Sequence, residues 1–253
     1  MRSINQAGRR GLLLLSFMLL PVTLNYFSPY LIIDGLFQGI LAGAFLLWGL
    51  FFVTSLVFGR AACSYVCPYG GLQMTMDKVL GKPLRQVRWL RHFKMALGAA
   101  WVLFILYPLI AGLPSFAVDP FYMTEHVISA DNAPKLIFYY FIVTMLALMP
   151  LFMGKRATCH YLCPMSLLNI AGTSVKDRGT WPSLRLVAEP EQCVSCGKCS
   201  KACSMSLNVT EMVRSGDPRH AECILCGECV TACPTGAVDR KFCSRKRPER
   251  HSA

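Results

Sequence analysis

The chain has 253 residues, a formal net charge of +12 and 13 cysteines; 54% of its residues are hydrophobic and only 16% are charged. A soluble domain averages about 25% charged residues, so this composition excludes an ordinary soluble protein and indicates a membrane protein of one or two domains. The cysteines are spaced like metal ligands, which argues against the disulfide framework of a small secreted domain.

Four stretches without charged residues are long enough to cross a membrane as helices, which takes ~17–25 residues. They are Gly11–Ile33, Gly35–Phe58, Met95–Val118 and Leu136–Gly154. These stretches lack the polar face that each helix of a soluble bundle needs. We therefore predict four transmembrane helices. The first stretch is too long for a secretory signal and lacks its cleavage motif, so we expect an uncleaved anchor.

Basic residues gather at one end of the predicted spans. They precede the first span, fill the link between the second and third, and follow the fourth: Arg2, Arg9, Arg10, Arg60, Lys78, Lys82, Arg85, Arg88, Arg91, Lys94, Lys155 and Arg156. Such residues mark the cytoplasmic side. We therefore expect a multi-pass protein of the inner (cytoplasmic) membrane, in contact with lipid and with both termini in the cytoplasm. The basic link lacks the interleaved aromatics of a nucleic-acid-binding segment, so no nucleic-acid partner is expected.

A nine-residue motif occurs twice, 96 residues apart. It reads RAACSYVCP at residues 60–68 and RATCHYLCP at residues 156–164. Each copy ends a predicted pair of spans, so we expect residues 1–175 to form an α-helical membrane domain of two repeated hairpins. Pro68 and Pro164 suit the first turn of a following helix, and we expect both of these helices to lie along the cytoplasmic surface.

Each copy of the motif contains a C-x3-C pair at the same predicted depth. The pairs are Cys63 with Cys67 and Cys159 with Cys163. Three interpretations are open. The four cysteines could share a third metal centre, each pair could be a dithiol on one helix face, or the thiols could be packing residues. In a shared centre, Arg60 and Arg156 would lie beside anionic thiolates.

Two runs of the form C-x2-C-x2-C-x3-C follow, after a predicted polar linker at residues 176–188. They are Cys193, Cys196, Cys199 and Cys203, then Cys223, Cys226, Cys229 and Cys233. In two-cluster ferredoxins the fourth cysteine of each run binds the other cluster. We therefore expect one [4Fe–4S] cluster on Cys193, Cys196, Cys199 and Cys233, and a second on Cys223, Cys226, Cys229 and Cys203. Residues 189–242 are predicted to form a small cytoplasmic α+β ferredoxin-like domain.

Zinc and haem are the competing interpretations of these cysteines. Zinc modules place two C-x2-C pairs far apart, whereas here a triple recurs, which favours iron–sulfur. No C-x-x-C-H motif for haem attachment occurs, and none of the five histidines falls inside a predicted span. Ser204 replaces the usual proline after Cys203, a departure that removes no ligand. Residues 243–253 are predicted to be a basic tail.

The paired C-x3-C-P motifs, followed by two cluster-binding runs, resemble the NapH/MauN family, membrane components of quinol dehydrogenase modules. The resemblance extends from about Leu12 to Phe242. NosR-like and CcoG-like proteins share this core, and the chain lacks their large extra domains, which favours the NapH-like interpretation. The resemblance implies a protein that oxidises membrane quinol and passes the electrons through iron–sulfur centres to a partner redox protein or oxidoreductase.

A quinol site needs an apolar slot, a hydrogen-bond acceptor and an exit for protons. The outer loops offer Asp34, Asp119, Glu125 and His126, and His126 titrates in a useful range. Tyrosines and acids are also common at a membrane interface, so these residues could simply mark that interface. Two other functions fit the motifs: a reductase that assists metal-cofactor assembly of another enzyme, and an iron–sulfur redox sensor.

Overall fold

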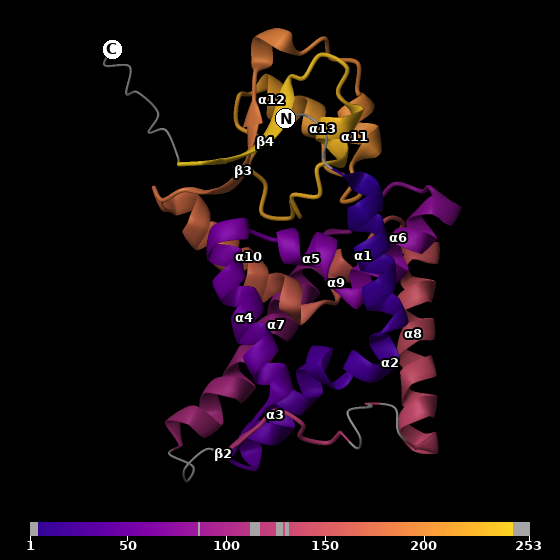
Figure 1. The fold of residues 1–253 in the computed structure, drawn as a ribbon, viewed down its shortest axis with the longest axis vertical. Helices are drawn as coiled ribbons and strands as arrows, with labels where there is room; N and C mark the ends of the chain where they lie inside the picture. Colours follow the sequence, from indigo (N-terminus) through magenta and orange to yellow (C-terminus); the bar gives the residue numbers. More distant parts are fainter. Residues whose placement is uncertain (1–4, 86, 112–116, 125–128, 130–131, 245–253) are drawn as a thin grey trace.

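The computed structural model describes residues 5–85, 87–111, 117–124, 129 and 132–244. The chain forms a tall helical part and, above it, a smaller unit of short helices and strands (Figure 1). The last helix of the tall part ends at Arg178, and the smaller unit begins at Ser183. The first helix starts beside the smaller unit, because Gln6 donates a hydrogen bond to the carbonyl of Cys226.

The first predicted span, Gly11–Ile33, is not one helix. The chain there forms α1 (Gln6–Met18), α2 (Leu20–Thr23), η1 (Asn25–Phe27) and α3 (Pro29–Phe37). Pro21 has no N–H for the ladder of α1, and its ring would clash with the carbonyl of Phe17. Pro29 keeps Ser28 extended, with ψ 120°, which ends the preceding turn. Asp34, expected in an outer loop, consequently lies inside α3.

The second predicted span, Gly35–Phe58, is shorter than expected. Gly39 adopts a left-handed φ of 72° after α3, and the chain then forms strand β1 (Ile40–Ala42) and α4 (Gly43–Phe58). The 16 residues of α4 extend about 24 Å as a helix, less than the ~30 Å of the hydrocarbon core. Strand β1 pairs in parallel with β2 (Ala117–Asp119).

Most of the third predicted span and the fourth form long helices, α7 (Arg88–Ile110) and α8 (Ala133–Met153). The end of the third span, Ala117 and Val118, belongs to β2, and residues 112–116 lie outside the described residues. Within the described residues, α7 and α8 are long and apolar enough to cross a membrane. Only 11% of each apolar stretch is buried in the protein, whereas a core helix of a soluble protein would be mostly buried. The exposed apolar faces suit lipid. The predicted set of four full-length spans is not confirmed.

The two copies of the nine-residue motif lead into the same succession of elements. The first copy continues α4 with α5 (Ala61–Tyr65) and α6 (Pro68–Leu80), and the second continues α8 with α9 (Ala157–Tyr161) and α10 (Pro164–Arg178). The copies pack crosswise: α10 lies along α4, and α6 packs against α1 and α8 (Figure 1). The helices after the motifs are therefore packed against other helices of the helical part. That they lie along the cytoplasmic surface of a membrane stays a prediction.

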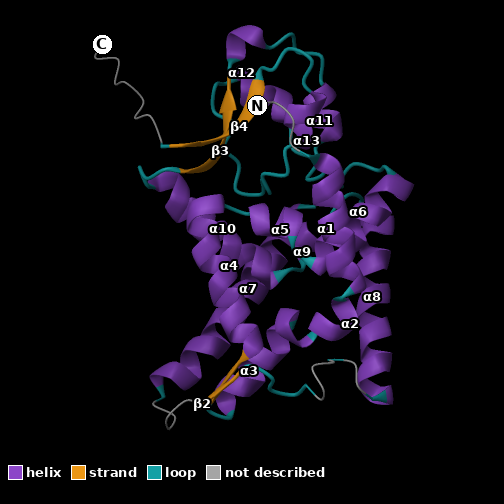
Figure 2. Ribbon diagram, in the orientation of Figure 1, coloured by secondary structure: helices purple, strands orange, loops and turns teal. Residues whose placement is uncertain are grey.

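The smaller unit is closed by two antiparallel strands, β3 (Ser183–Ala188) and β4 (Val238–Cys243), with Ser183 opposite Cys243. Between them lie η2 (Pro190–Gln192), α11 (Lys198–Ala202), α12 (Val209–Arg214) and α13 (Glu228–Ala232) (Figure 2). Residues 176–188, predicted as a linker, instead finish α10 and form β3. The unit therefore begins before residue 189, because β3 has its hydrogen-bonding partner at the far end of the unit. Of the predicted basic tail, the part beyond Ser244 lies outside the described residues.

Candidate iron–sulfur sites

The two cysteine runs of the smaller unit surround two separate cavities. Three cysteines of the first run line one cavity together with the last cysteine of the second run: Cys193, Cys196, Cys199 and Cys233. The other cavity is lined by Cys223, Cys226, Cys229 and Cys203. The fourth cysteine of each run therefore faces the cavity of the other run. This is the placement that crossed ligation of two clusters requires.

The backbone of both runs turns in the same way. Gly197 and Gly227 stand at the N-terminal ends of α11 and α13 with φ of 72° and 77°, a region that side chains rarely allow. Two residues earlier, Ser195 and Leu225 also have positive φ, 54° and 50°. Such alternating backbone turns the peptide N–H groups toward an enclosed anion, a feature of many iron–sulfur sites. The loops therefore suit a negatively charged cluster.

The spacing of the side chains favours a cluster over a single ion. Within the described residues, no group of three or more His, Cys, Asp or Glu side chains is arranged to hold one metal ion. A zinc ion would need its thiolates about 2.3 Å from a common centre. Each set of four cysteines instead lines a small cavity. All 13 cysteines, each within the described residues, are free of disulfide bonds.

A third cavity brings the two C-x3-C pairs together. It has a volume of about 300 Å³, and its lining includes Cys63, Cys67, Cys159 and Cys163. The pairs come from α5 and α9 and from the residues just before α6 and α10. Sequence alone left open whether the pairs meet, and the crosswise packing of the two copies places them at one cavity. Asn169 Nδ2 from α10 donates to Cys63 Sγ at 3.7 Å.

The thiols at the third cavity are strongly desolvated. Burial raises the pKa of the Cys163 thiol to about 12. Burial also raises the pKa of Cys63, although the nearby Arg60 guanidinium opposes the shift. Thiols in such surroundings stay protonated unless a metal takes the place of the proton. Burial of Cys63 and Cys163 is therefore compatible with metal ligation.

An ion-pair network joins the third cavity to the smaller unit. Arg60, which lines the cavity, donates to Glu222 Oε2 at 2.5 Å and to the carbonyl of Ala221 at 3.3 Å. Lys94 Nζ of α7 bonds the other carboxylate oxygen at 3.2 Å. Burial raises the pKa of Glu222, but the two cations outweigh it and lower the pKa to about 2. Glu222 directly precedes Cys223, so the network fixes the second cluster loop.

The N-terminal helix holds the same unit at a second point. Arg9 and Arg10 both bond the carboxylate of Glu228, at 2.5 Å and 3.0 Å, and Glu228 is the first residue of α13. His160, beside Cys159, bonds the carbonyl of Met205 at 3.2 Å, and burial lowers its pKa to about 4. From the sequence, the basic residues were expected only as markers of the cytoplasmic side. The sequence signal for these ion pairs was an acid next to each cluster loop: Glu222 precedes Cys223, and Glu228 follows Gly227.

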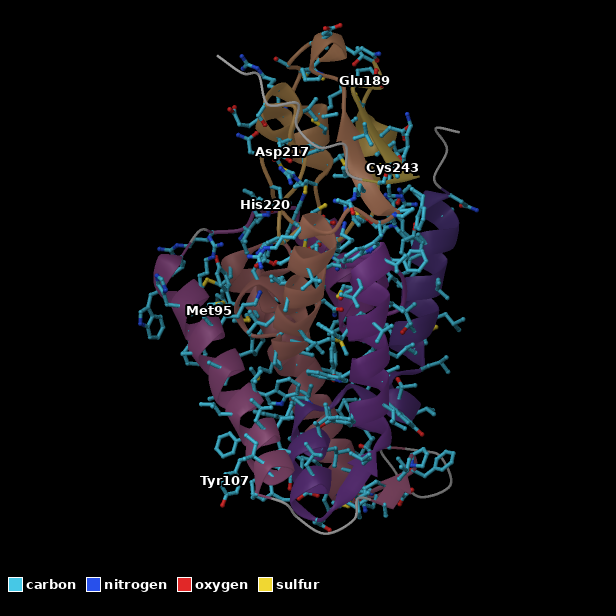
Figure 3. All side chains as sticks on the ribbon, turned by 90° about the vertical axis from the view of Figure 1, so that its left-hand side faces the viewer. Met95, Tyr107, Glu189, Asp217, His220 and Cys243 are labelled. Carbon is cyan, nitrogen blue, oxygen red and sulfur yellow. The ribbon has the colours of Figure 1, made fainter. Side chains whose placement is uncertain are left out.

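The second cluster cavity is the one that faces the helical part. His220, two residues before Glu222, lies at the junction in Figure 3, whereas Glu189, near Cys193, lies at the outer end of the unit. Cys196 of the first cavity is exposed. The three cysteine sites therefore follow one another from the helical part to the outer surface.

The predicted outer quinol site is assembled only in part. Tyr122 Oη donates to Asp34 Oδ2 at 2.7 Å, and Gln38 Nε2 bonds the same oxygen at 3.3 Å. Asp119 Oδ1 accepts a bond from the backbone N–H of Phe121 at 3.0 Å. Glu125 and His126 lie outside the described residues. The carboxylate of Asp34 is thus already satisfied by neighbouring side chains.

Two family models match the segments that carry these sites. A 4Fe-4S dicluster domain matches residues 192–238. A 4Fe-4S binding domain matches residues 40–87 and 136–169, the segments that contain both C-x3-C-P pairs. The chain carries 4Fe–4S ferredoxin-type domains. We call residues 183–243, with the first two cavities, the ferredoxin unit.

One curated relative extends beyond these domains. "Putative electron transport protein YccM" of Escherichia coli (strain K12) is 27% identical over 206 residues, which cover 77% of this chain and 55% of that protein. The chain thus spans about half the length of the curated relative it matches. No solved structure matches the chain. None of these matches names the NapH/MauN family, and that assignment stays a prediction.

Proposed function

We propose that the chain is a membrane-bound iron–sulfur electron-transfer protein, which oxidises membrane quinol and passes the electrons to a partner oxidoreductase. The ferredoxin unit would hold two [4Fe–4S] clusters, with the crossed ligand sets described above. The four cysteines of the third cavity would hold a third centre. A [4Fe–4S] cluster supplies one-electron chemistry at a potential that the surrounding protein sets.

One observation carries this proposal: cysteines of all three sites belong to one continuous buried cluster of side chains. Cys63 packs in the same cluster as Cys203, Cys226 and Cys229, and Cys159 packs against it. Close packing of this kind keeps water out and holds redox centres at short, constant separations. A chain of centres from an apolar cavity to the surface suits electron transport, the role printed in the name of the E. coli relative.

Membrane attachment is supported by the surface of α7 and α8. Large apolar side chains stand exposed along both helices: Leu103, Phe104, Ile110, Ile137, Phe141 and Phe152. Tyr107, near the end of α7 far from the ferredoxin unit, points outward in Figure 3. Such surfaces are stable in lipid and would aggregate in water. The basic residues near the opposite end favour a cytoplasmic ferredoxin unit.

The outer end of the ferredoxin unit is where a partner would receive electrons. Cys196 is exposed there, and Val194 beside it is 64% exposed. A partner that covers this loop would approach the first cluster directly. The other cysteines of that cavity are partly or fully buried, so the surface around Cys196 is the shortest exit.

The test is electron transfer from quinol to the clusters in anaerobically purified protein, reconstituted in lipid nanodiscs. Reduced decylubiquinone should bleach the visible iron–sulfur absorbance. Cys63→Ser or Cys159→Ser should abolish this bleaching but leave reduction by dithionite intact. Cys243→Ser, which changes a cysteine outside all three cavities, serves as the control. Unchanged quinol-driven reduction in both motif variants would overturn the role of the third site.

A further inference from the structure

The third cavity contains polar atoms that have no partner. The side chain of Gln73 is fully buried, and within the described residues neither its Nε2 nor its Oε1 has a hydrogen-bond partner. Trp48 Nε1, Thr158 Oγ1 and Arg60 Nε are likewise buried and, among the described residues, without a partner. All four residues line the cavity. Buried polar groups are nearly always satisfied, so four such residues at one cavity point to a ligand.

The rest of the lining suits a flat, apolar molecule that enters from lipid. The rings of Trp48 and Trp101 lie 4.8 Å apart, and Leu97, Ile142 and Leu146 come from α7 and α8, the two helices with lipid-type surfaces. A volume of about 300 Å³ is at the lower end of the range for small-molecule sites. It suits a single ring system.

The chemistry of Gln73 separates the possible occupants. Sulfides and thiolates of a cluster accept hydrogen bonds and donate none. A cluster could therefore satisfy the N–H groups of Gln73 and Trp48, but it would leave Gln73 Oε1 unsatisfied. Because both ends of the amide lack a partner, exchanging its O and N positions does not change this result. Beside a cluster on the four cysteines, the cavity therefore needs a second occupant that donates as well as accepts.

We propose that the third cavity binds the headgroup of a membrane quinol, with Gln73, Trp48 and Thr158 as its hydrogen-bonding residues. A hydroquinone hydroxyl donates to Gln73 Oε1, and the opposite oxygen accepts from Trp48 Nε1 or Thr158 Oγ1. This inference rests on the proposed function and moves the site away from Asp34, whose carboxylate is occupied by Tyr122 and Gln38. The headgroup would then lie directly beside the four cysteines.

Groups of this chain can accept both the electrons and the protons that oxidation of the bound quinol releases. Loss of two electrons and two hydroxyl protons converts the hydroquinone to the quinone, and the two clusters of the ferredoxin unit take one electron each. Asp77, one helical turn after Gln73 on the same face of α6, lies outside the cavity lining and would take the two protons one after the other through intervening water. Its Oδ2 is buried without a hydrogen-bond partner among the described residues, while Oδ1 accepts from the backbone N–H of Arg156 at 3.2 Å. It passes each proton to water in turn.

The first experiment measures binding directly. Reduced decylubiquinone, kept anaerobic as the hydroquinone, should quench the fluorescence of Trp48 and Trp101 in purified protein. Gln73→Leu should raise the Kd of the hydroquinone by about tenfold or more, because the hydrogen bond from its hydroxyl to Gln73 Oε1 is lost. Thr158→Val is the second variant, with a smaller rise. Iron content and visible spectrum must match the parent protein, which establishes that the variants fold.

The matched control is Gln38→Leu, the same substitution at the outer cluster around Asp34. It should leave the Kd unchanged. If Gln38→Leu or Asp34→Asn raises the Kd and Gln73→Leu does not, the quinol binds outside and the inference is overturned.

Failure of the inference and failure of the proposed function give different results. Quinol-driven bleaching that persists at the parental rate in Gln73→Leu, with unchanged Kd, would overturn the site and leave the function standing. Tight binding that depends on Gln73, without any bleaching by quinol, would overturn quinol oxidation and keep the site.

Discussion

Glu222 is the residue through which the helical part holds the second cluster loop. It faces Arg60 and Lys94, whose side chains are 1% and 3% exposed. Neither cation can gain water if the carboxylate is removed. A buried charge that loses its partner is more costly than the pair was favourable. Sequence spacing cannot pair these three residues, because they are far apart in the chain.

Glu222→Gln should therefore lower the free energy of unfolding by about 3 kcal/mol. Folding lowers the pKa of this carboxyl to about 2, so the stabilisation is complete above its unfolded pKa and disappears as the pH falls toward 2. The difference between parent and variant should thus be constant from about pH 6 to about pH 8. Thermal unfolding in detergent measures it. Glu191→Gln, at an exposed position, is the control. An equal effect of both variants would contradict a stabilising role for the ion pairs of Glu222 with Arg60 and Lys94.

At the scale of elements, crossed ligation makes a prediction that single substitutions cannot test. Cys199 and Cys233 line the same cavity although they belong to different runs, whereas Cys199 and Cys203 share a run but line different cavities. The double variant Cys199→Ala/Cys233→Ala should lose about four iron atoms per chain, and Cys199→Ala/Cys203→Ala about eight. Iron analysis after anaerobic purification distinguishes them. The reverse order of losses would indicate uncrossed ligation.

The crosswise packing of the two copies can be tested at a glycine. A Cβ at Gly172 of α10 would lie 3.1 Å from Cβ of Ser55 and 3.3 Å from the carbonyl of Phe52, both on α4. Gly172→Ala should therefore destabilise the protein by about 1–3 kcal/mol. Gly49→Ala is the matched control, since nothing lies within 4 Å of its Cβ position; it should be neutral or stabilising by up to about 1 kcal/mol. Thermal unfolding of the two variants compares them, and equal stability would contradict the packing.

For the whole molecule, the proposal of three iron–sulfur centres predicts the iron content. The parent protein should contain about twelve iron atoms per chain, and Cys63→Ser about eight. A parent value near eight, unchanged by Cys63→Ser, would rule out a third cubane. Loss of the third centre should leave the ferredoxin unit folded, because its cavities are lined by its own residues.

Reporter fusions test the orientation. A reporter inserted after Gly81, whose Cβ position is free of neighbours, and one at the C-terminus should both report the cytoplasm. A reporter at Asp131 should report the exterior, because α7 leads away from the ferredoxin unit. An exterior C-terminus would contradict the orientation inferred from the basic residues.

Local spacing by itself determined much about this protein. The two C-x2-C-x2-C-x3-C runs predict two cavities with exchanged fourth cysteines, because a tight loop of three ligands encloses one corner of a cluster and leaves the fourth position to another segment. Hydrophobic length identified α7 and α8. Hydrophobic length gave a wrong prediction for Gly11–Ile33, because Pro21 and Pro29 interrupt the helix there although the stretch is apolar.

Only the tertiary structure decided which residues the two C-x3-C pairs and the buried charges contact. The meeting of Cys63 and Cys67 with Cys159 and Cys163 depends on α10 crossing onto α4 and α6 onto α8, contacts between segments about 100 residues apart. Likewise, the sequence shows that Arg60 is positively charged but not whether it lies in a loop or in a buried ion pair. Its partner Glu222 is 162 residues away. Spacing reports contacts within a turn or loop, whereas long-range contacts depend on how whole helices pack.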